Sequence, residues 1–344
     1  MHKSKIDVAV LLIFFNRPNT FAKVFEQVKI ARPHKLFLYQ DGARDGVAGD
    51  KAAVEQCRRI AGEIDWECEV HQNYQRGNHG CDPSEYMAQK WAFGLVDKCI
   101  VLEDDDVPSQ SFFPFCKELL DRYENDERIN MICGMNHMGV YEGTAYDYLF
   151  SYGGSITGWA SWGRVVRGWT EDYPLLADPA STKKFVEANR HKYDMRKYIA
   201  TAAKHRKSGK AHYESILSYH MFANHSINIV PKYNLISNIG NNSEGGTHAA
   251  RDERLLPKGI RKIFSMKTYE YSFPLNHPGF VMEDVEFKRR LDRIMGNGYP
   301  LVKLYRKWES RFLRIRHGEA SSLLYTLKKR LRKKAGAVQG NNDE

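Results

Sequence analysis

A short apolar run in the sequence ends abruptly in four consecutive acidic residues, Glu103, Asp104, Asp105 and Asp106. Adjacent carboxylates repel one another unless a cation lies between them. Their oxygens are hard ligands that suit Mg²⁺ or Mn²⁺, and these ions also bridge phosphate groups. The run therefore predicts a site for a divalent metal ion and a diphosphate at the end of a strand, and a solvated acidic turn is the alternative.

Two arginines and one asparagine lie near the ends of other predicted elements in the same half of the chain. The planar guanidinium groups of Arg17 and Arg44 can each pair with two diphosphate oxygens, although either can equally be an ordinary surface side chain. Asn78 comes just before a predicted helix, where backbone amides suit an anion. Together these residues predict basic and polar surroundings for the diphosphate.

The elements that position these residues can be predicted from hydrophobic periodicity. Short β-rich runs alternate with helical patterns over about the first 135 residues, which indicates an α/β fold with a mainly parallel central sheet flanked by helices. The expected strands lie at about 8–15, 35–40, 67–72, 98–102 and 129–133. Ligands of such sheets bind at the carboxyl ends of the strands, and the acidic run and both arginines fall at that edge.

Two helix starts are marked by their residue types. Asp82, Pro83 and Glu85 have the types of an N-cap, a first-turn proline and a reciprocal acid, so a helix should begin there and run to about Phe93. Ser111 similarly indicates the start of a helix. Later elements are expected as helices at about 181–208 and 213–225 and a strand at 227–230.

The periodicity breaks down between about 136 and 180, where glycine, tryptophan and tyrosine accumulate. This composition indicates a loop-like binding segment. Trp159 and Trp162 could stack on the face of an acceptor sugar or on the donor base, since aromatic faces offer a large contact area. Packing in the core is the alternative for both tryptophans.

Several of these segments together resemble a GT-A glycosyltransferase, and in particular the bacterial HlpA-like "hemolytic protein" group of nucleotide-diphospho-sugar transferases. The likeness extends over roughly residues 6 to 250 and implies a Rossmann-like GT-A fold. It is carried by Phe15-Asn16-Arg17-Pro18, Tyr39-Gln40-Asp41-Gly42, Leu102 to Asp105 with Pro108, Ser111-Phe112-Phe113, Gly158 to Trp162, and Asn234 to Gly240 with Gly246-Thr247-His248.

The resemblance implies a nucleotide-sugar donor, such as a UDP-sugar, and a divalent metal held by the last acid of a Glu-Asp-Asp motif, which falls on Asp105. Asp106 departs from the family pattern and leaves a shifted Asp104-x-Asp106 register open. Asp41 is implied to accept hydrogen bonds from uracil or ribose, with a turn-forming Asp-Gly as the alternative. The expected donor-binding residues are Asn16, Arg17, Asp41, Arg44, Asn78, Glu103 and Asp104.

A histidine and two acids complete the expected active site. His248 lies in a glycine-rich loop that lets the backbone approach a ligand, and GT-A folds often complete the metal site with a C-terminal histidine. Inverting transfer needs a carboxylate that deprotonates the acceptor hydroxyl while the metal carries charge on the departing diphosphate. Glu214 occupies the place of the family's aspartate and is the candidate base, with helix capping as its alternative. Asp172 is the second candidate.

The composition predicts one large domain with a basic appendage. The chain has 344 residues with 42% hydrophobic content, which suffices for a GT-A domain at 1–285, followed by a basic amphipathic helical tail at 286–344. Most of the formal charge of +10 comes from the tail, where twelve Lys and Arg oppose Glu309 and Glu319 between 303 and 334. Basic amphipathic helices lie on anionic membranes, and a solvated helix packed on the domain is the alternative. No nucleic-acid module is expected.

The eight-residue apolar stretch near the N-terminus is too short for a membrane span and has no cleavage site after it, which predicts a cytoplasmic protein, peripheral at the inner face of the membrane. The six cysteines include no Cys-x-x-Cys pair and are expected to be reduced and packed. The sequence therefore predicts an inverting, metal-dependent glycosyltransferase in surface polysaccharide or lipopolysaccharide synthesis. A sugar-phosphate nucleotidyltransferase would need a glycine-rich loop after the first strand, and a non-enzymatic membrane-active protein would need a long apolar segment.

Overall fold

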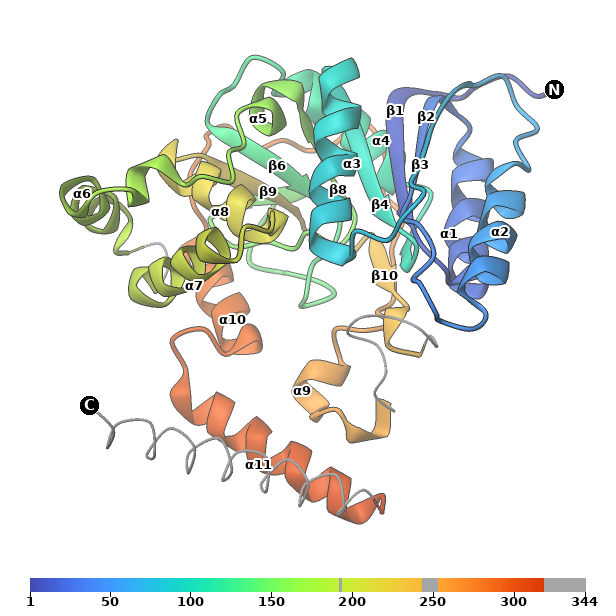
Figure 1. The fold of residues 1–344 in the computed structure, drawn as a ribbon. Helices are drawn as coiled ribbons and strands as arrows, with labels where there is room; N and C mark the ends of the chain where they lie inside the picture. The colour runs from blue at the N-terminus through green and yellow to red at the C-terminus, as the bar shows by residue number, and fades with distance from the viewer. Residues whose placement is uncertain (192–193, 243–252, 319–344) are drawn as a thin grey trace.

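The computed structural model describes residues 1–191, 194–242 and 253–318, and this part of the chain is a mixed α/β structure (Figure 1). Its large sheet has the strand order β3-β2-β1-β4-β8-β6-β9-β7. The strands of this sheet are β1 (Ile6–Phe14), β2 (Pro33–Gln40), β3 (Glu69–Tyr74), β4 (Lys98–Glu103), β6 (Ile129–Cys133), β7 (Tyr148–Ser151), β8 (Trp159–Trp162) and β9 (Ile227–Pro231). A separate antiparallel pair is formed by β5 (Asp106–Pro108) and β10 (Ile236–Asn238).

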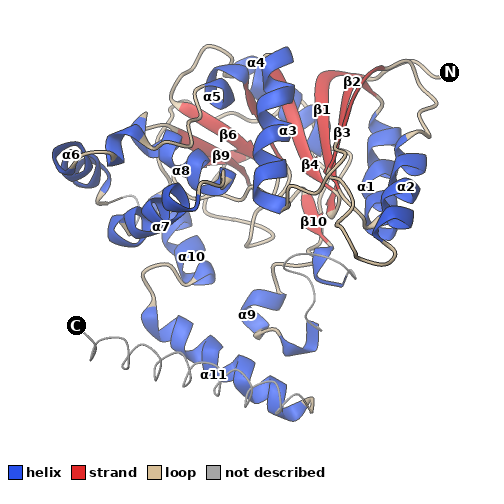
Figure 2. Cartoon of the chain, in the orientation of Figure 1, coloured by secondary structure: helices blue, strands red, loops and turns tan. Residues whose placement is uncertain are grey.

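Helices flank the sheet (Figure 2). The described α-helices are α1 (Pro18–Ala31), α2 (Asp50–Ala61), α3 (Cys81–Leu95), α4 (Phe112–Arg122), α5 (Gly163–Arg167), α6 (Pro179–Asn189), α7 (Met195–Ser208), α8 (Tyr213–Ala223), α9 (Lys258–Arg261), α10 (Val285–Met295) and α11 (Pro300–Arg316). Short 3-10 helices lie at Pro174–Leu176, Gly240–Asn242 and Glu253–Leu255.

The first half of the sheet is parallel and positions the predicted site. β1 pairs with β2 and β4, and β2 pairs with β3, all in parallel. Because successive strand residues point to opposite faces, Val10 and Leu12 pack in the core with α1 and α4, whereas Leu11 and Ile13 pack in the core with α3. The five strands predicted in the first 135 residues are confirmed, and the arrangement is compatible with a Rossmann-like fold.

The second half of the sheet corrects the expectation of a loop between 136 and 180. This segment contributes β7, β8 and α5, and β8 lies antiparallel between β4 and β6. Trp159 and Trp162 are therefore buried core residues, and their prediction as acceptor-binding residues is wrong. Trp159 stacks near Phe93, and the indole Nε1 of Trp162 donates to the carbonyl of Leu120 at 3.0 Å. A strand buried on both faces has no polar alternation, so its periodicity does not reveal it.

The start of α3 differs from its predicted capping. Gly80, with a φ of 86°, is the N-cap, and the cap has no side-chain hydrogen bond. Asp82 therefore lies inside the first turn, and Glu85 does not take part in capping the helix. Ser111 does stand at the N-cap of α4, but its Oγ accepts from the backbone of Tyr271 at 2.8 Å instead of capping the helix. A glycine with positive φ turned the chain into α3 without a capping side chain.

The predicted domain boundary at residue 285 is too early. Phe287 and Leu291 of α10 are buried in the core that contains α3 and α8, and the hydroxyl of Tyr141 donates to Asp284 at 2.9 Å. α10 therefore belongs to the domain, and the tail begins after it. Within the described residues, no helix combines the length and apolar character needed to cross a membrane.

Candidate active site

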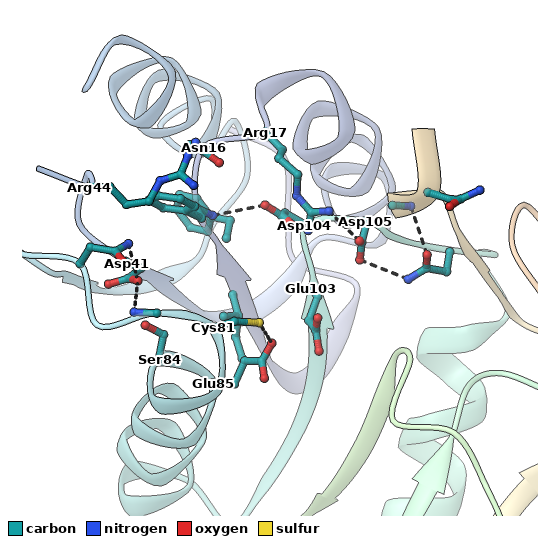
Figure 3. A pocket seen from close by; sticks show the side chains of 18 of the residues that line it. Asn16, Arg17, Asp41, Arg44, Cys81, Ser84, Glu85, Glu103, Asp104 and Asp105 are labelled. Carbon is teal, nitrogen blue, oxygen red and sulfur yellow. Dashed lines mark hydrogen bonds and ion pairs between the residues drawn. The ribbon is translucent and has the colours of Figure 1, made fainter. Parts of the chain in front are cut away.

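A cavity of about 420 Å³ lies at the carboxyl ends of β1, β2 and β4 (Figure 3). Its volume is within the range of small-molecule sites. The structure brings together here every predicted donor-binding residue and one predicted metal ligand: Asn16, Arg17, Asp41, Arg44, Asn78, Glu103, Asp104 and Asp105. The walls also contain residues that the predicted set does not include, among them Phe15, Cys81, Ser84, Glu85, Asn238, Gly240, Asn241 and Phe264.

The guanidinium group of Arg17 lies between two carboxylates of the acidic run (Figure 3). Its Nη2 pairs with Oδ1 of Asp104, and its Nη1 lies 2.8 Å from Oδ2 of Asp105. Burial disfavours the charged guanidinium, but the attraction of the two carboxylates outweighs it and raises the pKa of Arg17. The positive charge of Arg17 thus offsets the repulsion between the adjacent carboxylates of the acidic run.

The other oxygens of the two carboxylates also have partners. Oδ2 of Asp104 accepts from the backbone of Phe15 at 3.2 Å, and Oδ1 of Asp105 accepts from the amide of Asn238 at 3.3 Å. Burial raises the pKa of Asp104 even though Arg17 opposes that shift. Gly240 lies so close to Asp105 that a Cβ there would overlap with Oδ2 of that carboxylate. The segment from the end of β10 to Gly240 therefore closes one side of the acidic run.

Asp106 is not a cavity residue, which corrects its prediction as an alternative metal ligand. Its Oδ2 accepts from the backbone of Gly158 at 2.9 Å and of Glu103 at 3.3 Å, and its Oδ1 accepts from the amide of Asn238 at 3.2 Å. Burial is the main cause of the raised pKa of Asp106, and the charge of Asp105 adds to it. Asp106 links β5 to neighbouring strands, so only Asp105 of these two acids lines the cavity.

The described residues contain no group of three or more His, Cys, Asp or Glu side chains placed to hold a metal ion. His248, the predicted third metal-site residue, lies outside the described residues. The oxygen donor set of Asp104 and Asp105 suits Mg²⁺ or Mn²⁺ by type. Arg17 pairs with both carboxylates in this structure, so a metal ion at Asp105 would compete with that arginine.

Asp41 lines the cavity and organises the loop that follows β3, and its predicted contact with the nucleotide stays a prediction. Its Oδ1 accepts from the backbone of Gly42 and His79, both at 2.9 Å, and its Oδ2 accepts from the side chain of Asn78 at 2.8 Å and the backbone of Gly80 at 3.0 Å. A carboxylate offers about four acceptor positions, so all of them are engaged within the chain. Asp41 thus holds one cavity wall in place.

A buried aspartate that the sequence analysis missed connects two predicted residues. Asp50, at the start of α2, accepts from Nε and Nη2 of Arg44 at 2.6 and 2.8 Å and from the amide of Asn16 at 2.8 Å. The hydrogen bonds from Arg44 lower the pKa of Asp50 despite its burial. The guanidinium of Arg44 also lies 5.4 Å from the ring centroid of Phe15. Only an acid in the first turn of a helix marks Asp50 in the sequence.

Two glutamates form a second acidic group in the cavity. Glu85 from α3 and Glu103 from β4 both line it (Figure 3). Sγ of Cys81 lies 3.0 Å from Oε1 of Glu85, and the hydroxyl of Tyr213 donates to Oε1 of Glu103 at 3.2 Å. Burial, with nearby carboxylates adding to it, raises the pKa of Glu85 to about 7 and that of Glu103 well above its usual value. Sequence reasoning assigned Glu85 to helix capping and so missed this pair.

The two predicted catalytic bases do not line the cavity. Glu214 is exposed in the first turn of α8, although its charge adds to the effect of burial in raising the pKa of Glu85. Asp172 is exposed in the segment before the 3-10 helix at Pro174–Leu176, and its backbone donates to Oγ1 of Thr170 at 3.4 Å. The structure therefore brings Glu214 near the acidic pair and leaves Asp172 outside the site.

Comparison of the chain with protein-family models and with curated proteins finds no match in either case. The class that fold and site define is thus an α/β protein with a mainly parallel sheet and a polar cavity at its strand ends.

Proposed function

We propose that the protein is a GT-A glycosyltransferase that binds a nucleotide-sugar donor in this cavity and transfers the sugar to a glycan or lipid-linked acceptor. The observation that carries the proposal is the convergence of the segments after β1, β2 and β4 and at the start of α3 on one cavity. Strand order reverses between β1 and β4, and open α/β sheets bind ligands outside the strand ends at such a point. The sequence resemblance supports the reaction class, with a UDP-sugar as the expected donor in surface polysaccharide or lipopolysaccharide synthesis.

The diphosphate of the donor is assigned to the side of the cavity that holds Arg17. This guanidinium is partly buried beside Asp104 and Asp105, which raise its pKa and so favour its charged form. A planar guanidinium binds two phosphate oxygens at once. The loop around Asn78 and Gly80 forms the opposite wall, which Asp41 fixes in place. The preformed walls reduce the ordering that donor binding requires.

A divalent ion, Mn²⁺ or Mg²⁺, is part of the proposal. Such ions are commonly held by one or two carboxylates together with substrate phosphates, which suits a site with no complete protein cage among the described residues. Asp105, with Asp104 beside it, would hold the ion, and the ion would supply charge neutralisation for the departing diphosphate. Arg17 balances the same carboxylates when no ion is bound.

The acceptor hydroxyl needs a proton acceptor if transfer inverts the anomeric configuration. We assign this role to Glu85, because its carboxylate faces the cavity and its pKa of about 7 lies near neutral pH. Glu103 belongs to the same acidic group: burial raises its pKa, and its Oε1 accepts a hydrogen bond from the hydroxyl of Tyr213. Glu214, the base expected from the sequence, contributes through its charge.

Thermal denaturation with UDP, GDP or CDP, each with and without Mn²⁺, tests the donor site. One nucleotide should raise the melting temperature, because a ligand at a hundredfold excess over its Kd stabilises the folded state by about 2.7 kcal/mol. Asp105→Asn should remove the part of the shift that depends on Mn²⁺. Asp97→Asn, an exposed acid paired with Arg167, is the matched control and should keep it. No shift with any nucleotide would refute the donor site. If one nucleotide does give a shift, release of that nucleoside diphosphate from its sugar donors tests transfer.

A nucleotidyltransferase is the enzymatic alternative, and the segment after β1 argues against it. That segment has no glycine, since Asn16, Arg17 and Pro18 lead directly into α1. A glycine-rich turn lets backbone amides approach a triphosphate closely, and the side chains here prevent that approach. Stabilisation by UTP together with release of pyrophosphate from UTP and a sugar phosphate would favour the alternative.

A further inference from the structure

The outward face of α11 is apolar. Six large side chains of this helix are 51 to 78% exposed. At 3.6 residues per turn they fall within a single arc of about 100° around the helix axis. We call this arc the apolar stripe, and its residues are Leu301, Leu304, Tyr305, Trp308, Phe312 and Ile315.

Contacts made by α11 outside the stripe show which side of the helix faces the domain. Nη2 of Arg306 donates to the carbonyl of Ile294 at 2.6 Å, at the end of α10. Oε1 of Glu309 accepts from the backbone of Lys258 at 3.0 Å, at the start of α9. Arg306 and Glu309 therefore face the domain, whereas the residues of the apolar stripe are exposed. Figure 1 shows α11 at the edge of the described structure, beside α9 and α10.

A row of positive charges runs along one edge of the stripe. Lys307, Arg311 and Arg314 lie at helical positions that follow one another and adjoin the stripe on the same side. The only acidic residue of α11 is Glu309, and it is turned toward α9. The surface of the helix is thus apolar in one band and basic in the band beside it.

This pattern identifies the chemistry of what covers the stripe. Burial of six exposed apolar side chains favours a partner with an apolar layer, and the adjoining cations favour a partner whose surface is anionic. Trp308 and Tyr305 are residue types that prefer the boundary between lipid headgroups and acyl chains. A protein partner offers both properties only through a specific match, whereas an anionic lipid surface offers them everywhere.

We propose that α11 lies in the plane of an anionic lipid surface, with the apolar stripe at the boundary of headgroups and acyl chains and the basic row on the lipid phosphates. α9 contacts α11 and leads into Phe264, which lines the cavity. The backbone amide of Phe264 donates to the carbonyl of Arg261, at the end of α9, at 3.2 Å. Docking through α11 brings that wall of the cavity toward the lipid. The use of a lipid-linked acceptor follows from this placement and rests on the proposed function, whereas the docking itself does not.

Vesicle flotation of the full chain tests the docking. Wild-type protein should float with vesicles of an equimolar mixture of phosphatidylcholine and phosphatidylglycerol, and far less with phosphatidylcholine alone. The double variants Trp308→Ser with Phe312→Ser, and Lys307→Gln with Arg311→Gln, should each lose about tenfold or more in partitioning. Leu95→Ser, which alters an exposed apolar residue at the end of α3, is the matched control and should float as wild type.

Tryptophan fluorescence gives a second measurement. Trp308 is 62% exposed, whereas Trp66, Trp159, Trp162 and Trp169 are buried. Anionic vesicles should shift the emission of the wild type to shorter wavelength and protect it from acrylamide. Trp308→Phe keeps an apolar side chain, so it should still float while most of the spectral shift disappears.

Three outcomes overturn the docking. They are unchanged flotation of both double variants, equal binding to neutral and anionic vesicles, and a dimer in solution that Trp308→Ser with Phe312→Ser converts to a monomer without any vesicle binding. The last outcome would assign the stripe to a second copy of the chain. All these measurements are made without nucleotide, so failure of the donor site leaves the docking test intact.

Discussion

Replacement of Arg17 by alanine should destabilise the fold through the acidic run. The side chains of Asp104 and Asp105 are only 3% and 12% exposed, and that of Arg17 is 15% exposed. Removal of one partner from a buried ion pair costs about 3–5 kcal/mol, because the remaining charge is left without compensation. Hydrogen bonds from Phe15 and Asn238 persist in the variant, so we expect the lower end, ~3 kcal/mol, in the free energy of unfolding.

The loss should grow with pH. Burial already raises the pKa of Asp104 in the folded protein, and Arg17 limits that rise. Without Arg17 the folded state of the variant binds a proton that the unfolded state releases at a lower pH. Stability falls as pH rises wherever the folded state binds more protons. The difference between variant and wild type should therefore be small below the ordinary pKa of an aspartate and largest at pH above neutrality.

Urea unfolding at acidic and at mildly alkaline pH, followed by tryptophan fluorescence, measures this dependence. Asp104→Asn in the Arg17→Ala background should recover part of the lost stability, because it removes the uncompensated charge. Arg289→Ala is the matched control, since Arg289 pairs with the exposed Glu286, and it should unfold as wild type. An equal loss at both pH values, or no recovery on adding Asp104→Asn, would show that lost packing and not charge accounts for the effect.

Two further variants test the walls of the cavity. A Cβ at Gly42 would lie 2.5 Å from the backbone of Gly77, so Gly42→Ala should displace the loop before α3. This variant should have a lower melting temperature and a weaker nucleotide-dependent shift. Gly77→Ala is the control and should be tolerated, because a Cβ at Gly77 meets no atom within 4 Å. Glu85→Gln should lower kcat by about 10²–10⁴-fold with little change in donor binding. Between the usual pKa of a glutamate and about pH 7, the folded wild type keeps a proton on Glu85 that the unfolded chain has released, so the free energy of unfolding falls as the pH rises. The Glu85→Gln variant should show a flatter decline over this range. An unchanged profile would contradict the assignment.

Local sequence patterns were sufficient for the elements around the site. Strands such as β1 and β4 are continuous apolar runs that end in polar residues, and the polar residues that follow them do line one cavity. Patterns failed where burial is complete or where a glycine replaces a capping side chain. β8 has no polar alternation, so Trp159 and Trp162 were expected in a loop, and Gly80 made Asp82 unnecessary as a cap.

The sequence by itself determined which residues gather at the strand ends, because parallel strands carry their carboxyl ends to one edge of a sheet. Only the tertiary structure decided what each does there. Arg17 lies 88 positions from Asp105, yet its guanidinium balances that carboxylate. Glu85 became part of an acidic pair with Glu103 because α3 packs beside β4. The charge of a buried group depends on its neighbours in space, and spacing along the chain does not record them.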